Sequence, residues 1–298
     1  MTIERILRRA LGRDRPVSVT ARAYRSMPTG TTNLKEGRPI SAGMEDPHFK
    51  ARFVDVPAIL ADWFRPYSRI QDADVLDFGC GEGIAALGLA LGFHPRRVVG
   101  VDIMPDPARC LEVAKKNLPI ESLPECLQLH QVEPGHLHND ADRFDLAYSW
   151  SVFEHVDQTL LDQSLALIRS ALRPGGLFLA QIAPLYYSAE GSHLNHVLAA
   201  PWVHLRTQQN RLEDMLRRAV PDVTEANALW STYCTLNKIT HQDLVSRIRS
   251  NGFDILRTFT TTQDIKPPAE LLDVFKAEAL TTNQVVVLAR ASAATAIT

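Results

Sequence analysis

The chain has 298 residues, of which 45% are hydrophobic and 22% are charged, as in an ordinary globular protein with a large core. This composition excludes a chain that is disordered throughout. The 32 basic and 34 acidic side chains leave a formal net charge of -2, which excludes a general attraction to nucleic acid or to anionic membranes.

Residues 1–46 predict a basic N-terminal helix followed by a flexible arm. Five arginines share helical spacing with apolar residues up to residue 15, and the stretch that follows has no sustained apolar period. The helix either rests on an anionic membrane surface or packs against the domain. Because no run approaches about 20 apolar residues, we expect no stable membrane insertion and a cytoplasmic protein.

Residues 47–298 predict one α/β domain. A helix is expected over 47–64, where apolar residues recur at three- and four-residue steps. Strand and helix patterns then alternate, which predicts a doubly wound, mostly parallel sheet with helices on both faces. Strands are expected at 74–78, 97–102, 126–132, 144–149 and 176–182, and helices at 82–91, 105–117 and 158–172.

The alternation is interrupted at residues 184–239, which we expect to form an inserted cover over the substrate. One helix is predicted within this segment, over 211–219. The alternation resumes with a helix expected over 240–250, in which Thr240 and Asp243 resemble a capping box. Further strands are expected at 253–259 and 284–289. The four cysteines lack metal-ligand spacing and are expected to stay reduced.

The strongest motif is the glycine-rich turn after the first strand, which reads VLDFGCGEG over residues 75–83. Glycines let the backbone approach a ligand closely, and the helix that follows offers unpaired N–H groups. A dinucleotide fold needs glycine where Ile84 stands, so the dehydrogenase pattern is not met. Asp77 would repel a pyrophosphate but can hold an ammonium group, which favours S-adenosylmethionine.

A second carboxylate, Asp102, ends the strand expected at 97–102. It stands about 20 residues past the glycine turn, the spacing at which such folds bind both ribose hydroxyls. The alternative interpretation is a turn acid or helix N-cap. Its placement together with the glycine turn favours the ribose.

Five segments together resemble the successive motifs of class I S-adenosylmethionine-dependent methyltransferases, and especially their small-molecule branch: 75–83, 98–102, 144–146 (Phe-Asp-Leu), 154–156 (Glu-His-Val) and 172–176 (Leu-Arg-Pro-Gly-Gly). The resemblance spans roughly residues 47–290. It implies a Rossmann-like sheet of seven strands with the last one antiparallel, and S-adenosylmethionine as cofactor. Glu133 stands where that family usually has the aspartate of an Asp-Ala pair beside the adenine. The cofactor residues so implied are Asp77, Gly79, Cys80, Gly81, Asp102, Ile103, Glu133 and Ser149.

Residues 184–205 carry more tyrosines and histidines than a mere connection needs. His193 is predicted to act as a general base on a hydroxyl acceptor, because an imidazole titrates near working pH, and His155 is the second choice. A competing interpretation makes His193 a structural cap that is hydrogen-bonded to backbone. The residues expected to contact the acceptor are Tyr186, Tyr187, His196, Trp202 and His204.

No metal is expected, since Ser149 and Trp150 stand where a magnesium-dependent, catechol-type methyltransferase has a carboxylate. The resulting hypothesis is O-methylation of a small molecule or a glycan, with no nucleic-acid partner. Two alternatives remain open: methylation of a protein or RNA, and a catalytically silent module that binds S-adenosylmethionine. The oligomeric state is left open as well.

Overall fold

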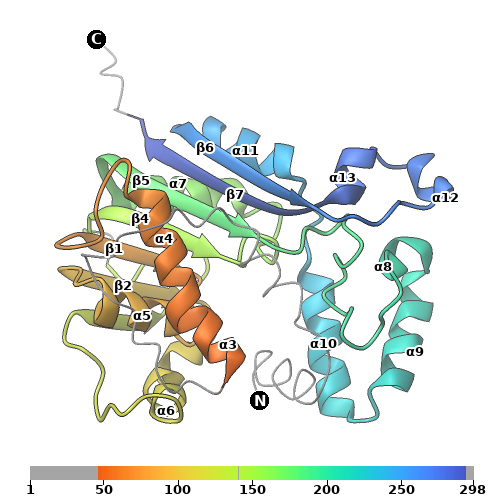
Figure 1. The fold of residues 1–298 in the computed structure, drawn as a ribbon, viewed down its shortest axis with the longest axis horizontal. Coiled ribbons are helices and arrows are strands. Elements are labelled where there is room, and N and C mark those ends of the chain that lie inside the picture. The colour runs from red at the N-terminus through yellow and green to blue at the C-terminus, as the bar shows by residue number, and fades with distance from the viewer. Residues whose placement is uncertain (1–45, 140, 293–298) are drawn as a thin grey trace.

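The computed structural model describes residues 46–139 and 141–292, so the predicted basic helix and nearly all of the arm lie outside the described residues. Seven strands form one sheet in the order β3-β2-β1-β4-β5-β7-β6 (Figure 1). The strands are β1 (Asp74–Phe78), β2 (Arg97–Asp102), β3 (Leu127–Gln131), β4 (Phe144–Trp150), β5 (Leu172–Ile182), β6 (Phe253–Thr262) and β7 (Thr282–Ala291).

The pairing of the strands confirms the expected topology. Strands β1 to β5 pair in parallel, while β7 is antiparallel to both β5 and β6. The strand order reverses between β1 and β4, where successive connections leave in opposite directions. In an open α/β sheet, such a reversal leaves a ligand crevice at the carboxyl ends of the strands. The glycine turn follows β1 and therefore lies beside this crevice.

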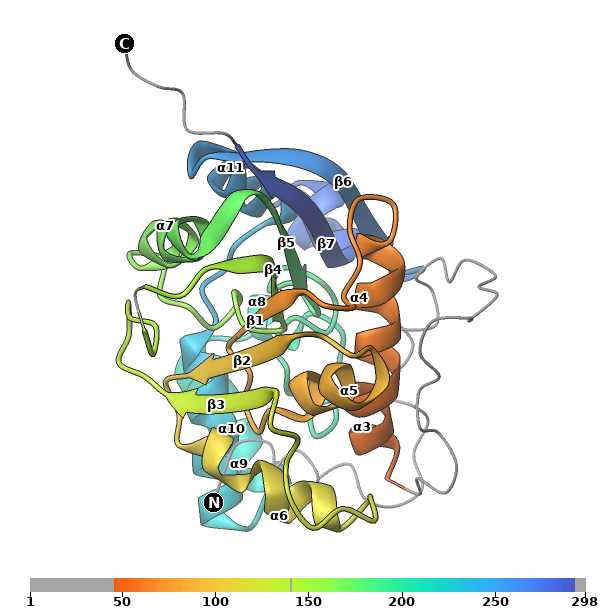
Figure 2. The ribbon, with the colours of Figure 1, turned by 90° about the vertical axis from the view of Figure 1, so that its left-hand side faces the viewer.

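Helices cover both faces of the sheet, as predicted (Figure 2). Side chains alternate between the two faces along each strand, so Tyr148 belongs to one core and its neighbour Ala147 to the other. On the Tyr148 face lie α3 (Pro47–Lys50), α4 (Val56–Phe64), α5 (Ile84–Gly92) and α6 (Cys110–Lys115), and on the other face lie α7 (Leu161–Ala171) and α11 (His241–Ser250).

The first helix of the domain is continuous over the predicted residues but contains a π-helical turn, η1 (Ala51–Asp55), between α3 and α4. It begins at Pro47 because the Asp46 carboxylate accepts hydrogen bonds from two backbone N–H groups of the first turn. The π-turn carries Arg52, whose charge acts on groups at the carboxyl ends of β1 and β4. Such turns occur frequently at functional sites.

Two predicted helices differ from the observed ones for local reasons. The helix after β1 begins at Ile84 rather than at residue 82, because Gly83 adopts a left-handed φ of 73° and still belongs to the turn. The helix expected over 105–117 is split into a short 3-10 helix, η2 (Asp106–Arg109), and α6. The prolines at residues 105 and 107 stand in this first turn, where their missing N–H groups cost no intrahelical bond, and a tighter 3-10 turn is common at the N-terminus of an α-helix.

The inserted segment folds into three helices, α8 (Val203–Arg206), α9 (Gln209–Ala219) and α10 (Val223–Thr235), around a small apolar core of its own. The sequence predicted only the second of them. Helix α10 was missed because its β-branched and aromatic residues have modest helix propensity, although Asp222 caps its first turn. Two further short helices, α12 (Ala269–Leu272) and α13 (Ala277–Thr281), stand between β6 and β7. None of the helices in the described ranges could cross a membrane.

Candidate active site

The glycine turn has the backbone geometry of a ligand cradle. Gly79, Gly81 and Gly83 all have positive φ angles, of 82°, 55° and 73°. A Cβ atom on Gly79 would lie 2.4 Å from Val152, and one on Gly83 would lie 2.5 Å from Leu129. A Cβ atom on Gly81 would meet nothing within 4 Å. Two glycines are therefore required by packing, whereas Gly81 borders open space in which a ligand can sit against the backbone.

Asp102 closes this cradle from the end of β2. One carboxylate oxygen accepts a hydrogen bond from the Gly81 N–H at 2.7 Å, and the other accepts from the Met104 N–H at 2.9 Å. These are the contacts of a turn acid, yet each oxygen keeps a further lone pair for a ribose hydroxyl. The neighbouring Ile103 side chain is 55% exposed and presents an apolar surface beside the carboxylate.

Asp77 lies at the carboxyl end of β1 and is almost fully buried. Its carboxylate accepts a hydrogen bond from the Tyr148 hydroxyl at 2.7 Å. Burial raises the pKa of Asp77 to about 7; the charge of Asp102 adds to the effect, whereas the Tyr148 hydrogen bond and the charge of Arg52 oppose it. A cationic ammonium group beside Asp77 would offset that burial, so this side chain fits the amino group of S-adenosylmethionine.

The other predicted cofactor residues surround this centre in different ways. Burial holds the pKa of the Cys80 thiol well above its usual value, so it stays protonated within the turn. Ser149 is completely buried, and its hydroxyl has no partner among the described residues. Glu133 is exposed on the connection that leaves β3. The structure thus brings Asp77, the glycine turn and Asp102 together at one edge.

The loop after β4 places a buried carboxyl group at the same edge of the sheet. Asn237 holds this loop, because its side-chain amide donates to the carbonyls of Phe153 at 2.6 Å and Val156 at 2.7 Å. Glu154 is 3% exposed, and within the described part of the chain neither of its carboxyl oxygens has a hydrogen-bond partner. Burial raises the pKa of Glu154 to about 8, although the backbone N–H of Glu154 itself and the charge of Arg52 oppose the shift.

His155, the next residue, has a defined tautomer. Its Nδ1 lies 2.8 Å from the Thr235 hydroxyl, which itself donates to the Thr232 carbonyl at 2.7 Å. The hydroxyl hydrogen is therefore engaged, so Nδ1–H donates to Thr235 and the lone pair is on Nε2. Burial lowers the pKa of His155 to about 3, and the nearby His193 adds to this effect.

His193 contacts His155 edge to face, with ring centroids 5.2 Å apart. Its Nε2 lies 3.0 Å from the Pro184 carbonyl, which can only accept, so the proton is on Nε2 and the lone pair is on Nδ1. This is the backbone bond that the structural interpretation of His193 expects. Burial lowers the pKa of His193 to about 4, although the hydrogen bond to Pro184 opposes the shift. The imidazole is neutral at working pH and only weakly basic.

The remaining predicted acceptor residues mostly hold the insert together. His204 donates to the Tyr186 carbonyl at 2.6 Å, and the Trp202 indole donates to the Tyr187 carbonyl at 3.1 Å. Two ring nitrogens are buried without a partner among the described residues: Nε2 of His196 and Nδ1 of His204. In residues 46–139 and 141–292 no group of metal-binding side chains converges on one point.

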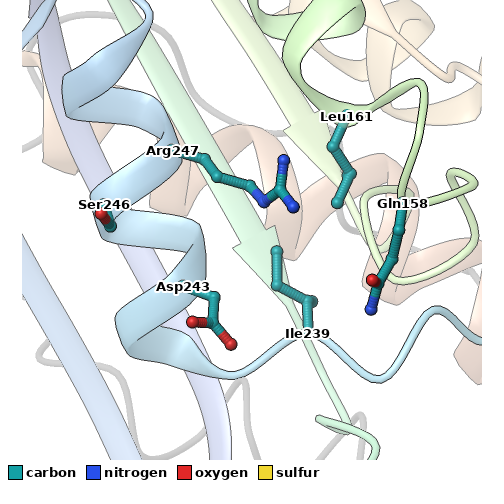
Figure 3. Close-up of a pocket in the computed structure, with 6 residues that line it drawn as sticks. All are labelled: Gln158, Leu161, Ile239, Asp243, Ser246 and Arg247. Carbon is teal, nitrogen blue, oxygen red and sulfur yellow. The ribbon is translucent and has the colours of Figure 1, made fainter.

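A cavity of about 370 Å³ lies away from the glycine turn, between α11 and the beginning of α7 (Figure 3). Arg247 reaches from α11 toward Leu161 in this view, and its guanidinium donates to Asp162. Asp243 belongs to the capping box of α11, which confirms the predicted motif. The charged groups of this cavity are therefore already engaged. Its lining residues are Gln158, Leu161, Ile239, Asp243, Ser246 and Arg247.

A protein family described as a methyltransferase domain matches residues 52–258, which is more than half of the chain. The chain therefore belongs to this methyltransferase family, and its cofactor is S-adenosylmethionine. No curated protein sequence matches the chain.

Several solved structures are similar to the chain at low sequence identity. The [4+2]-cyclase SpnF is 15% identical, with a TM-score of 0.51 and 93% of each chain covered. The magnesium protoporphyrin IX methyltransferase ChlM from Synechocystis, with bound S-adenosylhomocysteine, is 14% identical, with a TM-score of 0.49 over 97% of this chain and 94% of that chain. The N-methyltransferase NodS from Bradyrhizobium japonicum is 13% identical, with a TM-score of 0.47 over 83% of this chain and 89% of that chain. At an identity this low, the comparison with SpnF, whose TM-score is above 0.5, shows the fold alone.

Four residues of the site were not singled out by the sequence: Arg52, Tyr148, Glu154 and Asn237. Arg52 interrupts an apolar helical pattern, a signal that could have pointed to it. Glu154 belongs to the Glu-His-Val motif, but nothing in the sequence shows that its carboxyl group is buried. Tyr148 and Asn237 carry no comparable signal, because their roles depend on partners 71 and 81 residues away in the chain.

Proposed function

We propose that the chain transfers the methyl group of S-adenosylmethionine to a hydroxyl group of a small molecule or a glycan. The observation that carries this proposal is a gathering of buried polar atoms without partners. Across the described residues, most such atoms belong to the exit of β4, the insert and the start of β7. They lie on Ser149, Glu154, Ser188, His196, His204, Asn283 and Gln284.

Leaving a buried polar atom unpaired costs about 1–3 kcal/mol, so each one calls for an explanation. A polar acceptor with several hydroxyl groups would satisfy many of them at once, whereas an apolar acceptor would satisfy none. The lone pairs on His155 Nε2 and His193 Nδ1 suit the same ligand, because each can accept a hydrogen bond from a hydroxyl group.

The cofactor would lie along the glycine turn, with its ammonium group held by Asp77 and its ribose by Asp102. Ile103 and Glu133 would flank the adenine. When bound, S-adenosylmethionine supplies the activated methyl group and the leaving group. The chain's part is then to orient the acceptor and exclude water, and residues 184–239 would act as the cover that does so.

The test is methyl transfer from labelled S-adenosylmethionine to panels of glycans, phenols, amines, proteins and RNA. We expect label and S-adenosylhomocysteine to form with hydroxyl-bearing glycans or small molecules. Transfer only to amines, proteins or RNA would contradict the proposed acceptor. Calorimetry should show binding of S-adenosylhomocysteine but not of NAD, and binding without turnover on any panel would support the silent module instead.

A further inference from the structure

We propose that the carboxyl group of Glu154 takes up the proton that the acceptor hydroxyl loses during methyl transfer. The inference rests on the proposed function and adds to it a residue for which the sequence suggested no role. His193 and His155 would then contact and orient the acceptor rather than deprotonate it.

The position of Glu154 is the first argument. Strand β4 pairs with β1, so the loop after β4 lies beside the glycine turn at the reversal of the strand order. The charge of Arg52 acts on both Asp77 and Glu154, which places the two carboxyl groups in one electrostatic environment. The next residue in the chain, His155, contacts His193 of the insert. Glu154 thus stands between the cofactor cradle and the cover.

The state of the carboxyl group is the second argument. Glu154 is 3% exposed, and among the described residues neither of its carboxyl oxygens has a hydrogen-bond partner. Three hydrogen bonds from Asn237 hold the surrounding loop. One of them runs from the Asn237 backbone N–H to the Glu154 carbonyl at 2.9 Å. A structural carboxylate would be paired at such a site. An immobilised but unpaired carboxyl group is what a proton acceptor requires before its substrate arrives.

Basicity separates Glu154 from the two histidines. Burial lowers the pKa of His155 to about 3 and that of His193 to about 4, so both rings accept a proton only weakly near neutral pH. Burial has the opposite effect on an acid and raises the pKa of Glu154 to about 8. A base is most effective when its pKa lies near the working pH. Among the three groups, Glu154 meets that condition.

The charges balance across the transfer. The acceptor oxygen forms a bond to the methyl carbon, the carbon–sulfur bond breaks with its electron pair left on sulfur, and the hydroxyl proton moves to a Glu154 oxygen. A carboxylate and a sulfonium are present before the step, and a neutral carboxyl group and a neutral thioether after it. The net charge of the buried crevice therefore stays constant, which avoids leaving an isolated charge there. Of the other charged or titratable groups, Arg52 acts on Glu154 through its charge, His155 is the next residue, and His193 contacts His155.

The first experiment compares Glu154→Gln with Asp157→Asn. The control removes an exposed carboxylate from the same loop, which among the described residues accepts hydrogen bonds from Thr159. We expect Glu154→Gln to lower kcat by about 10²–10⁴-fold with little change in S-adenosylhomocysteine affinity. The wild-type rate should fall as the pH drops through the pKa of Glu154. The Gln variant should lack this low-pH limb of the pH–rate profile. Asp157→Asn should behave as wild type. Loss of the limb in His193→Ala or His155→Ala, with Glu154→Gln active, would overturn the proposal.

The second experiment needs no acceptor. Calorimetry in two buffers of different ionisation enthalpy counts the protons released when the cofactor binds at pH 7. Both S-adenosylmethionine and S-adenosylhomocysteine carry the ammonium group that acts on Asp77, but only the former carries the sulfonium. Binding of S-adenosylmethionine should therefore release more protons, by up to about one, than binding of its product.

Glu154→Gln should abolish this difference in proton release, whereas Asp157→Asn should keep it. A difference that persists in Glu154→Gln would overturn the assignment even if that variant is inactive. A wild-type chain that shows the difference but methylates no hydroxyl acceptor would instead contradict the proposed function. The two failures are thereby distinguishable.

Discussion

The cofactor cradle and the acceptor side of the crevice are built in different ways. The cradle consists of one glycine turn and the carboxyl groups of Asp77 and Asp102, and a bond from the Gly81 N–H joins the turn to Asp102. The acceptor side draws on the loop after β4, on the insert and on α10, and its bonds join residues about 80 apart in the chain. The comparison teaches that a site made of backbone can be read from a short motif, whereas a site made of side chains depends on the complete fold.

The difference extends to charge. In the cradle, both acids accept hydrogen bonds, Asp77 from the Tyr148 hydroxyl and Asp102 from the Gly81 N–H. On the acceptor side, buried groups keep unpaired atoms, and burial shifts the pKa of Glu154 upward and those of the histidines downward. The cradle is therefore suited to tight binding and the acceptor side to proton handling. Mutations in the two regions should separate affinity from turnover.

The largest effect should come from Gly81→Val. Its side chain would fill the open space along the backbone, and we expect affinity for S-adenosylhomocysteine to fall by more than about 100-fold, or roughly 3 kcal/mol. The matched control is Gly175→Val, since Gly175 also has a positive φ, of 78°, and nothing within 4 Å of its Cβ position. Both variants should lose similar stability through backbone strain, but only Gly81→Val should fail in calorimetry. Wild-type affinity in Gly81→Val would show that the ligand does not lie along this turn.

Asp77→Asn should lower the affinity for S-adenosylhomocysteine by about 1.5–3 kcal/mol, because a neutral amide holds an ammonium group less strongly. It should also stabilise the free protein at high pH. The pKa of Asp77 is raised to about 7 in the folded state, so the wild type loses stability as the pH rises from about 4 through 7. The variant escapes that loss.

Thermal unfolding of Asp77→Asn and wild type at pH 5 and pH 8 measures this effect. The gain should be at most a few kcal/mol at pH 8, since each pKa unit corresponds to about 1.4 kcal/mol, and smaller at pH 5. An equal gain at both pH values would mean that the carboxyl group is not titrating in the folded protein.

Asp102→Ala should lower affinity by about 1.5–3 kcal/mol and also destabilise the turn, because the N–H groups of Gly81 and Met104 lose their acceptor. Asp102→Asn separates the two effects, because the asparagine side chain keeps one acceptor oxygen but carries no charge. Calorimetry and thermal unfolding of both variants provide the measurements. A fall in melting temperature with unchanged affinity would make Asp102 a turn acid only.

The same contrast explains what could be predicted from the sequence. The alternation of strands and helices follows from periodicity, and the glycine turn is a contiguous motif. The antiparallel last strand is what the resemblance to the methyltransferase family implied, and the structure confirms the sheet. The insert was harder, because its tyrosines and histidines resemble a substrate site in composition, while Trp202 and His204 bond to the insert's own backbone. Burial of Glu154 could not be predicted, because residues distant in the chain create it.

The smallest effect should come from Asn237→Ala, which acts on the acceptor side without touching the cradle. Asn237 donates to the carbonyls of Phe153 and Val156, and its loss leaves both without this donor. We expect a stability loss of about 1–3 kcal/mol and, because Glu154 and His155 are then less well fixed, a fall in kcat of about tenfold. Affinity for S-adenosylhomocysteine should stay at the wild-type value.

Asn117→Ala is the control, since it removes a side-chain bond to the Val113 carbonyl at the end of α6. The control should lose less stability and keep full turnover. Equal turnover in both variants would mean that the loop after β4 does not need to be held for methyl transfer, and a parallel loss of cofactor affinity in Asn237→Ala would mean that the two halves of the crevice are not separable.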